Sequence, residues 1–179
     1  VVQFSGGEPT IYPRFIEVLA MARDMGFTQI QAATNGLMFT DPEFAQAAKE
    51  AGLHTLYLQF DGVSDEIYLR TRGEALLEKK LQCIENVRKA GMKICFVPTI
   101  VRGINEHQIG DIIRLAIQNI DVVSAISFQP VSFCGRISRR ELEEKRFTQS
   151  DFAQAVSEQT GICQPYEDWF PLSFVAPFS

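Results

Sequence analysis

The 179-residue sequence lacks the features that mark membrane proteins and nucleic-acid-binding proteins. No apolar run approaches the ~20 residues that a membrane-spanning helix needs. Basic residues are in deficit, since 17 Lys and Arg stand against 22 Asp and Glu and give a net charge of −5. A broad electrostatic attraction to nucleic acid or to anionic lipid is therefore not expected. These absences favour a cytoplasmic protein with a small-molecule partner, no nucleic-acid partner and no membrane span.

Closely spaced cysteines are missing too. The cysteines are Cys83, Cys95, Cys134 and Cys163, and their separations of 12, 39 and 29 positions do not match a local metal-binding pair. We interpret them as buried or incidental thiols, because free Cys is among the most buried residue types. The residues themselves therefore predict no metal ligand.

The sequence does contain enough apolar residues, 46%, to bury a sizeable core, and it contains a repeating unit. Residues 24–27, 50–53 and 89–92 each place a glycine between a helix-like segment and a strand-like one. Glycine is the residue best able to adopt the left-handed conformation that ends a helix. The repeat therefore indicates a succession of βα units.

The apolar patterns locate these units along the chain. Segments rich in β-branched and aromatic residues predict strands over residues 1–5, 28–33, 55–60, 93–100 and 124–129. Helices are predicted over residues 14–25, 43–51, 76–90 and 106–118. Strands that alternate with helices imply parallel pairing, and hence an α/β fold with a doubly wound sheet or a barrel. In both architectures ligands bind at the carboxyl ends of the strands.

The predicted helix over residues 76–90 has one apolar face. Its apolar residues recur at helical spacing and predict a stripe that faces the core: Leu77, Leu81, Ile84 and Val87. The charged residues of the same helix are interpreted as solvated surface: Glu78, Lys79, Lys80, Glu85, Arg88 and Lys89. No binding role is assigned to any of these charges.

Polar or glycine-containing loops follow the predicted strands, and Gly6-Gly7-Glu8-Pro9 is the most informative of them. Its two glycines let the backbone come close to a bound molecule, while Pro9 fixes the exit direction of the chain. Glu8 places a carboxylate at the rim, which suits a cationic group. A phosphate-binding loop would instead need a Lys followed by Ser or Thr, which this loop lacks.

Two of the loops resemble motifs of a known family. Residues 4–10 are similar to the Gly-Gly-Glu-Pro signature after the second strand of radical S-adenosylmethionine (SAM) enzymes. Thr34-Asn35-Gly36 is similar to the turn that ends the third strand in members related to the molybdenum-cofactor cyclase. The resemblance covers roughly residues 1–133. It implies a partial (β/α)6 TIM-barrel-like core, of which this chain supplies strands two to six with their helices.

The resemblance also implies a SAM site. Glu8 and the backbone of Gly6 and Gly7 would engage the amino group of the methionine half of SAM. The full set of implied cofactor-binding residues is Gly6, Gly7, Glu8, Pro9, Thr34, Asn35, Gln59, Asp61, Arg102, Asn105, Gln129 and Val131. A surface cation at Arg102 and a helix cap at Asn105 are the alternatives for those two residues.

In this family a [4Fe–4S] cluster held by three cysteines reduces SAM, and the resulting deoxyadenosyl radical abstracts a hydrogen from the substrate. The cluster cysteines have the spacing Cys-x-x-x-Cys-x-x-Cys, which no cysteines of this sequence show. We therefore expect a piece of a radical SAM enzyme, inactive alone, with its cluster ligands upstream of Val1. The family also implies an electron donor such as ferredoxin or flavodoxin. No catalytic residue is assigned.

The chain is divided into a barrel core over residues 1–138 and an extension over residues 139–179 that holds a charged helix and an aromatic segment. Residues 129–136 and 168–174 resemble a branch that includes methanopterin-methylating and tetraether lipid synthase enzymes. That branch implies a pterin or lipid substrate. It would place the substrate near Phe133, Cys134, Arg136 and Trp169.

Two other functions remain open at this point. A barrel aldolase or isomerase acting on a phosphorylated small molecule would share the βα frame. It would need a phosphate site in the late loops, together with a Schiff-base Lys or an acid–base pair on a strand, whereas Lys93 begins a predicted strand instead of ending one. The second alternative is a non-catalytic barrel adaptor that keeps the fold without the chemistry.

Overall fold

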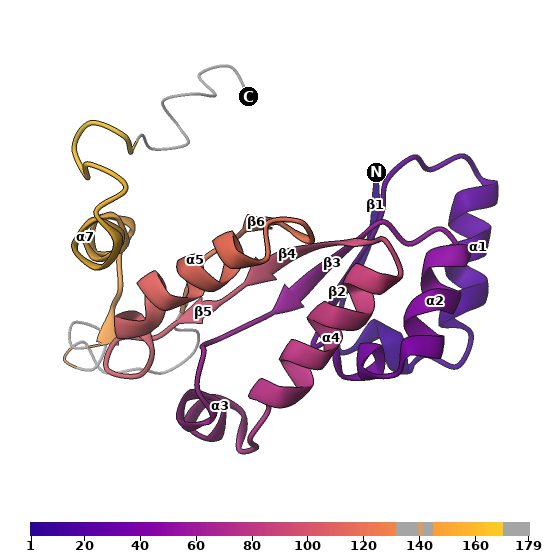
Figure 1. Cartoon of the computed structure of the whole chain (residues 1–179), viewed down its shortest axis with the longest axis horizontal. Coiled ribbons are helices and arrows are strands. Elements are labelled where there is room, and N and C mark those ends of the chain that lie inside the picture. Colours follow the sequence, from indigo (N-terminus) through magenta and orange to yellow (C-terminus); the bar gives the residue numbers. More distant parts are fainter. Residues whose placement is uncertain (132–139, 141–144, 170–179) are drawn as a thin grey trace.

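A parallel sheet organises the computed structural model, which describes residues 1–131, 140 and 145–169. Five strands lie in the order β1-β2-β3-β4-β6, so neighbouring strands follow one another along the chain (Figure 1). The strands are β1 (Val2–Phe4), β2 (Ile30–Thr34), β3 (Thr55–Gln59), β4 (Lys93–Val97) and β6 (Val123–Ile126). Every pairing is parallel. The α/β class predicted from the sequence is confirmed.

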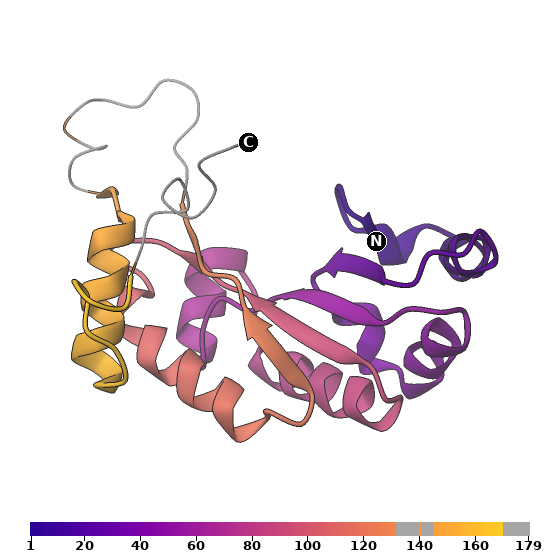
Figure 2. The ribbon, with the colours of Figure 1, turned by 90° about the horizontal axis from the view of Figure 1, so that it is seen from above.

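Helices connect the strands along one side of the curved sheet (Figure 2). The α-helices are α1 (Phe15–Asp24), α2 (Pro42–Glu50), α3 (Asp65–Arg72), α4 (Leu77–Lys89), α5 (Ile109–Gln118) and α7 (Gln149–Thr160). Short 3-10 helices are η1 (Pro9–Ile11), η2 (Leu37–Thr40) and η3 (Glu106–Gln108). None of the helices in the described part of the chain is long and apolar enough to cross a membrane.

The three glycine seams predicted from the sequence end α1, α2 and α4. After each glycine, the next backbone N–H donates to a carbonyl of the preceding helix: Phe27 to Ala22, Leu53 to Ala48 and Met92 to Val87. This bond closes the end of the helix and returns an apolar residue to the core, where Leu53 and Met92 are buried. The βα repeat therefore arises from local helix-ending chemistry.

Two of the predicted strands are each divided into two. The expected strand over residues 93–100 forms β4 and then β5 (Thr99–Ile100), because Pro98 between them has no N–H to donate. The expected strand over residues 124–129 forms β6 and then β7 (Gln129–Pro130). β5 and β7 pair as a separate small parallel sheet. The division places residues 127–131 at the edge of the candidate site described below.

Helix α4 faces the core with most of the predicted apolar stripe: Ile84 and Val87 are buried, and Leu77 packs against the core. Its buried residues are Lys80, Cys83, Ile84, Asn86 and Val87. Leu81, which was predicted to face the core, is 44% exposed. The prediction of Lys80 as solvated surface is wrong, because Lys80 lies on the same helical face as Ile84 and Val87 and is only 1% exposed.

Helix α7 packs against α5 and extends the core beyond the main sheet. Phe152 and Val156 of α7 form an apolar cluster with Ile109 and Ile113 of α5. The helix begins with a capping box in which Thr148 and Asp151 each accept a hydrogen bond from the other's backbone N–H. A helix over residues 150–159 was expected in the extension, and α7 confirms it. The boundary at residue 138 stays a prediction, and most of the highly charged stretch over residues 139–146 lies outside the described residues.

Candidate functional site

A cavity of about 590 Å³ opens at the carboxyl ends of the strands. Its lining residues come from each strand of the main sheet or the loop after it, and from α3: Gln3, Gly6, Gly7, Glu8, Ala33, Thr34, Asn35, Tyr57, Gln59, Arg72, Val97, Ser127 and Gln129. Alternation along β3 turns Tyr57 and Gln59 toward the cavity and buries Leu58 on the opposite face. Seven of the predicted site residues therefore meet in one place.

The Glu8 carboxylate joins the loop after β1 to the end of β2. Its Oε1 atom accepts from the Thr10 backbone N–H at 3.1 Å, from the Thr10 hydroxyl at 2.6 Å and from the Thr34 hydroxyl at 2.7 Å. Its Oε2 atom accepts from the Asn35 backbone N–H at 2.7 Å. Residues 26 and 27 positions apart are thereby fixed against each other. Glu8 thus connects the Gly-Gly-Glu-Pro motif directly to the Thr-Asn-Gly motif.

The two glycines before Glu8 leave space at the cavity wall. Gly6 and Gly7 have φ angles of +96° and +54°, which residues with a side chain rarely adopt. No heavy atom lies within 4 Å of the position that a Cβ would take at either glycine. The backbone of this loop is therefore open to close approach by a ligand.

At Gly36, which follows Asn35, there is no room for a side chain. Its φ is +79°, and an added Cβ would lie 2.4 Å from Leu58 Cδ1 and 3.1 Å from Cys83 Sγ. We expect Gly36→Ala to lower the free energy of unfolding by about 2–4 kcal/mol, since it adds overpacking to backbone strain. Urea unfolding measures this loss.

Gly73→Ala is the matched control, because Gly73 has a φ of +80° with no heavy atom within 4 Å of an added Cβ. It carries the backbone strain alone and should cost about 1 kcal/mol. Equal losses for the two variants would contradict the crowding at Gly36.

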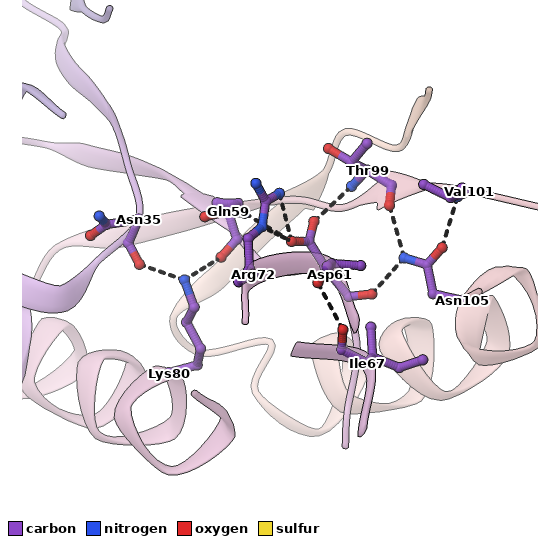
Figure 3. A network of polar contacts seen from close by, with 10 residues as sticks. Asn35, Gln59, Asp61, Ile67, Arg72, Lys80, Thr99, Val101 and Asn105 are labelled. Carbon is purple, nitrogen blue, oxygen red and sulfur yellow. Dashed lines mark hydrogen bonds and ion pairs between the residues drawn. The ribbon is translucent and has the colours of Figure 1, made fainter. Parts of the chain in front are cut away.

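The carboxylate of Asp61 holds together a second network of polar contacts (Figure 3). Asp61 is fully buried, and its Oδ2 atom accepts from Gln59 Nε2 at 2.8 Å and from Arg72 Nε at 2.8 Å. Its Oδ1 atom accepts from the Thr99 backbone N–H at 3.0 Å. The ion pair with Arg72 closes at 2.7 Å, and the Arg72 side chain is 39% exposed. Asp61 thus fixes two cavity-lining side chains without lining the cavity itself.

Asn105 secures the loop behind Asp61. Its Nδ2 atom donates to the Asp61 backbone carbonyl and to the Thr99 carbonyl, each at 2.8 Å, and its Oδ1 atom accepts from the Val101 N–H at 2.8 Å. The residue is fully buried. Asn105 does not cap the following helix with its side chain, which was the alternative considered from the sequence. It instead joins three backbone segments.

The remaining predicted site residues lie away from the cavity lining. Arg102 forms an ion pair with Asp151 at 2.8 Å, donates to the Arg146 carbonyl at 2.7 Å and lies over the Phe147 ring. Pro9 begins η1, and Val131 donates its N–H to the Ile100 carbonyl. Arg102 therefore joins the loop after β5 to the start of α7.

The predicted substrate residues are only partly described. Phe133, Cys134 and Arg136 lie outside the described residues. Trp169 packs against Phe152 and lines a different cavity of about 740 Å³, which lies mainly between residues 126–130 and α7. Among the described residues, none that lines this second cavity is charged. It is therefore less suited to a charged ligand than the cavity at Glu8.

Arg72 and Lys80 are site residues that the sequence reasoning missed. Arg72 lies in α3, a short helix of eight residues that buries only Ile67 and Tyr68 and gave no clear apolar periodicity. Lys80 donates from α4 to backbone carbonyls at the cavity. Burial lowers the pKa of Lys80 to about 8 and raises the pKa of the neighbouring Cys83 thiol to about 12. The sequence signal for Lys80 was its helical spacing, because it lies four and seven positions before Ile84 and Val87 and therefore on their face of the helix.

Neither the cysteines nor the acidic residues gather into a metal site in the described ranges. Within residues 1–131, 140 and 145–169, no group of three His, Cys, Asp or Glu side chains is placed to hold a metal ion. Cys83 and Cys95 are buried free thiols, as expected from the sequence, and Cys163 is partly exposed. The described residues therefore fit an organic cation better than a metal cluster.

Comparison with known proteins identifies the class. Residues 1–116, more than half of the chain, match the family described as the Radical SAM superfamily. The chain belongs to the radical SAM superfamily, whose members use SAM and a [4Fe–4S] cluster. This assignment excludes the aldolase or isomerase alternative.

Individual relatives are enzymes. The chain is 48% identical over 179 residues to the 7,8-dihydro-6-hydroxymethylpterin dimethyltransferase of Methanocaldococcus jannaschii. The match covers 99% of this chain and 35% of that enzyme. It is 27% identical over 132 residues to the GTP 3',8-cyclase of Alkaliphilus oremlandii, covering 73% of this chain and 41% of that enzyme. The chain thus spans well under half the length of these relatives.

A solved structure shares the fold. A domain of the pyruvate-formate lyase-activating enzyme from Bacteroides vulgatus matches with a TM-score of 0.62 and 15% sequence identity. The match covers 88% of this chain and 93% of that domain. The partial-barrel architecture predicted from the sequence is therefore confirmed.

Proposed function

We propose that the cavity binds SAM and that the chain is the SAM-binding part of a radical SAM enzyme acting on a pterin-class substrate. One observation carries the proposal: the Glu8 carboxylate lies in a cavity of about 590 Å³, on a loop fixed to Thr34 and Asn35. Ligand pockets for small molecules span roughly 300–1,000 Å³, so the size suits a nucleoside with an amino-acid arm. Bound SAM supplies a sulfonium whose reductive cleavage starts the radical chemistry of this family.

Glu8 would receive the ammonium of SAM. A carboxylate offers about four lone-pair positions. Within the described part of the chain, Oε1 accepts from Thr10 and Thr34, whereas Oε2 accepts from the Asn35 N–H alone. Oε2 therefore keeps a position for a cation, with which it forms a charge-assisted hydrogen bond. The open backbone of Gly6 and Gly7 gives that cation room to approach.

Arg72 would bind the carboxylate of the methionine half. Its Nε and one Nη atom hold Asp61, which leaves further N–H donors of the guanidinium for a second anion. Gln59 and Gln129, whose side chains line the cavity, would donate to the ribose and adenine. For Pro9, Asp61, Arg102, Asn105 and Val131 we propose an indirect role, in which they hold the loops that line the cavity.

The pterin class comes from the name of the relative with 48% identity, a pterin dimethyltransferase. The described residues of this chain do not fit a [4Fe–4S] cluster, so the proposal assigns them no step that passes through one. A lipid substrate, a ferredoxin or flavodoxin donor and a cytoplasmic location stay predictions from the resemblance.

Calorimetric titration of the chain with SAM tests the proposal, with ATP as the matched probe. Both ligands carry adenosine, but ATP presents phosphates where SAM presents an ammonium, and Glu8 should repel them. We expect saturable binding of SAM and no comparable binding of ATP. Absence of SAM binding would favour the non-catalytic adaptor, and tight ATP binding would contradict the role given to Glu8.

A further inference from the structure

Lys80 lies at the junction of the two polar networks of the site (Figure 3). Its Nζ atom donates to the Asn35 carbonyl at 2.5 Å and to the Gln59 carbonyl at 2.9 Å. The Asn35 carbonyl comes directly after β2 and the Gln59 carbonyl ends β3, and these two strands are neighbours in the sheet. One ammonium from α4 therefore links the carboxyl ends of two strands from beneath the cavity.

Both partners of Lys80 are also partners of the site. The N–H of Asn35 donates to Glu8, while the Asn35 carbonyl accepts from Lys80, so that residue is held from both sides. The side chain of Gln59 donates to Asp61, while its carbonyl accepts from Lys80. Lys80 is the group that connects the Glu8 network to the Asp61 network.

We propose that Lys80 is a positioning residue for SAM binding, which holds the ends of β2 and β3 so that Asn35 keeps the Glu8 carboxylate in its binding orientation. This inference rests on the proposed function of the cavity. Lys80 is buried beneath these carbonyls and is absent from the cavity lining, so it acts through Asn35 and Gln59 without touching the ligand. The ammonium strengthens both bonds because hydrogen bonds from charged donors are stronger than neutral ones.

The surroundings of Lys80 set when that charge is present. Burial and the charge of Arg72 lower the pKa of Lys80, whereas Cys83, Asp61 and Glu8 raise it, and the Tyr68 ring centroid lies 5.9 Å from Nζ. The pKa of Lys80 is lowered to about 8 by burial, so the ammonium is lost as the pH rises through that value. The pKa of Cys83 is raised to about 12 and that of Tyr68 is raised further, so neither group titrates over the same range.

The first test compares Lys80→Met with Lys79→Met. Both variants remove an ammonium from α4, but Lys79 is exposed and Lys80 is buried. We expect Lys80→Met to weaken SAM binding by roughly tenfold or more, since two partly buried carbonyls lose a charged donor, while Lys79→Met binds as the wild type does. Circular dichroism establishes that each variant is folded before calorimetry.

The second test needs no variant and no ligand. In the wild-type chain, the carbonyl carbon resonances of Asn35 and Gln59, and the amide nitrogen resonances of Gly36 and Phe60 that follow them, should shift together with a midpoint near pH 8. Nuclear magnetic resonance at pH 6.5 to 9.5 measures these shifts. The same titration should persist in Lys79→Met.

The outcomes separate the two proposals. A wild-type chain that fails to bind SAM, yet shows the coupled titration at Asn35 and Gln59, would overturn the function of the cavity and leave the Lys80 link intact. A folded Lys80→Met variant that binds SAM as tightly as Lys79→Met would overturn the positioning role alone. If Lys80→Met does not fold, the wild-type titration decides when it is extended until the Nζ resonance of Lys80 itself shows deprotonation. Asn35 and Gln59 carbonyl resonances that do not respond to that deprotonation would overturn the proposal.

Discussion

Glu8→Gln is expected to weaken SAM binding by roughly 10- to 100-fold, the equivalent of about 1.5–3 kcal/mol for a hydrogen bond to a charged group. The variant removes the negative charge that the proposal assigns to the ammonium. It also replaces one acceptor oxygen by an amide NH2, which cannot accept the hydrogen bonds that Thr10, Thr34 and Asn35 donate to the carboxylate. Calorimetric titration of the folded variant measures the loss.

The matched control for this prediction is Glu17→Gln in α1. The Glu17 side chain is 62% exposed and forms an ion pair with Arg14, the N-cap residue of the same helix. Its neutralisation should leave SAM binding unchanged, because surface ion pairs contribute little. If Glu8→Gln binds SAM as well as Glu17→Gln does, the ammonium is held elsewhere and the account of the loop fails.

Asp61→Ala is expected to lower the free energy of unfolding by about 3 kcal/mol. Removing one partner of a buried ion pair costs about 3–5 kcal/mol, and the partial exposure of Arg72 places the expected loss at the lower end. The change also leaves the Thr99 N–H and the Gln59 amide without their acceptor. Urea unfolding followed by circular dichroism measures the effect.

Asp111→Ala provides the comparison for Asp61. Asp111 forms an ion pair with Arg114 one turn along α5, and both side chains are about half exposed. Its removal should cost less than about 1 kcal/mol. A loss at Asp61 no larger than the loss at Asp111 would show that the buried network does not stabilise the end of β3.

Much of this site could be predicted because its chemistry lies in contiguous motifs. Glu8 follows the first strand and Thr34-Asn35 ends the second, and parallel strands bring their carboxyl ends to one rim. The order of elements therefore placed these residues together before any contact was known. The hydrogen bonds from Thr34 and Asn35 to Glu8 show that these residues do lie together.

Lys80 could not be predicted as part of the site because it departs from the usual rule for charge. A Lys in a helix rich in charged residues is ordinarily solvated, and Lys is almost never fully buried unless it is paired. Here the partners are carbonyls of Asn35 and Gln59, which are 45 and 21 positions away in the sequence. No local pattern encodes contacts of that range.

Arg72 and the division at Pro98 escaped prediction for different reasons. Helix α3 is short and largely polar, so its existence depends on the packing of Ile67 and Tyr68. Pro98 interrupts an apolar run that reads as one strand, and the N–H after it is satisfied by Asp61 in place of a strand partner. Helix α3 and the break at Pro98 thus depend on contacts between residues far apart in the sequence. The helix ends at Gly26, Gly52 and Gly91 depend on local hydrogen bonds and could be predicted.

The most direct test of the central claim is a crystal structure of the chain with SAM bound. The account predicts the methionine ammonium at the Gly6-Gly7-Glu8 loop, within hydrogen-bond distance of Glu8 Oε2, and the nucleoside in the cavity beside Gln59 and Gln129. SAM bound outside that cavity, or bound within it with the ammonium turned away from Glu8, would contradict the account.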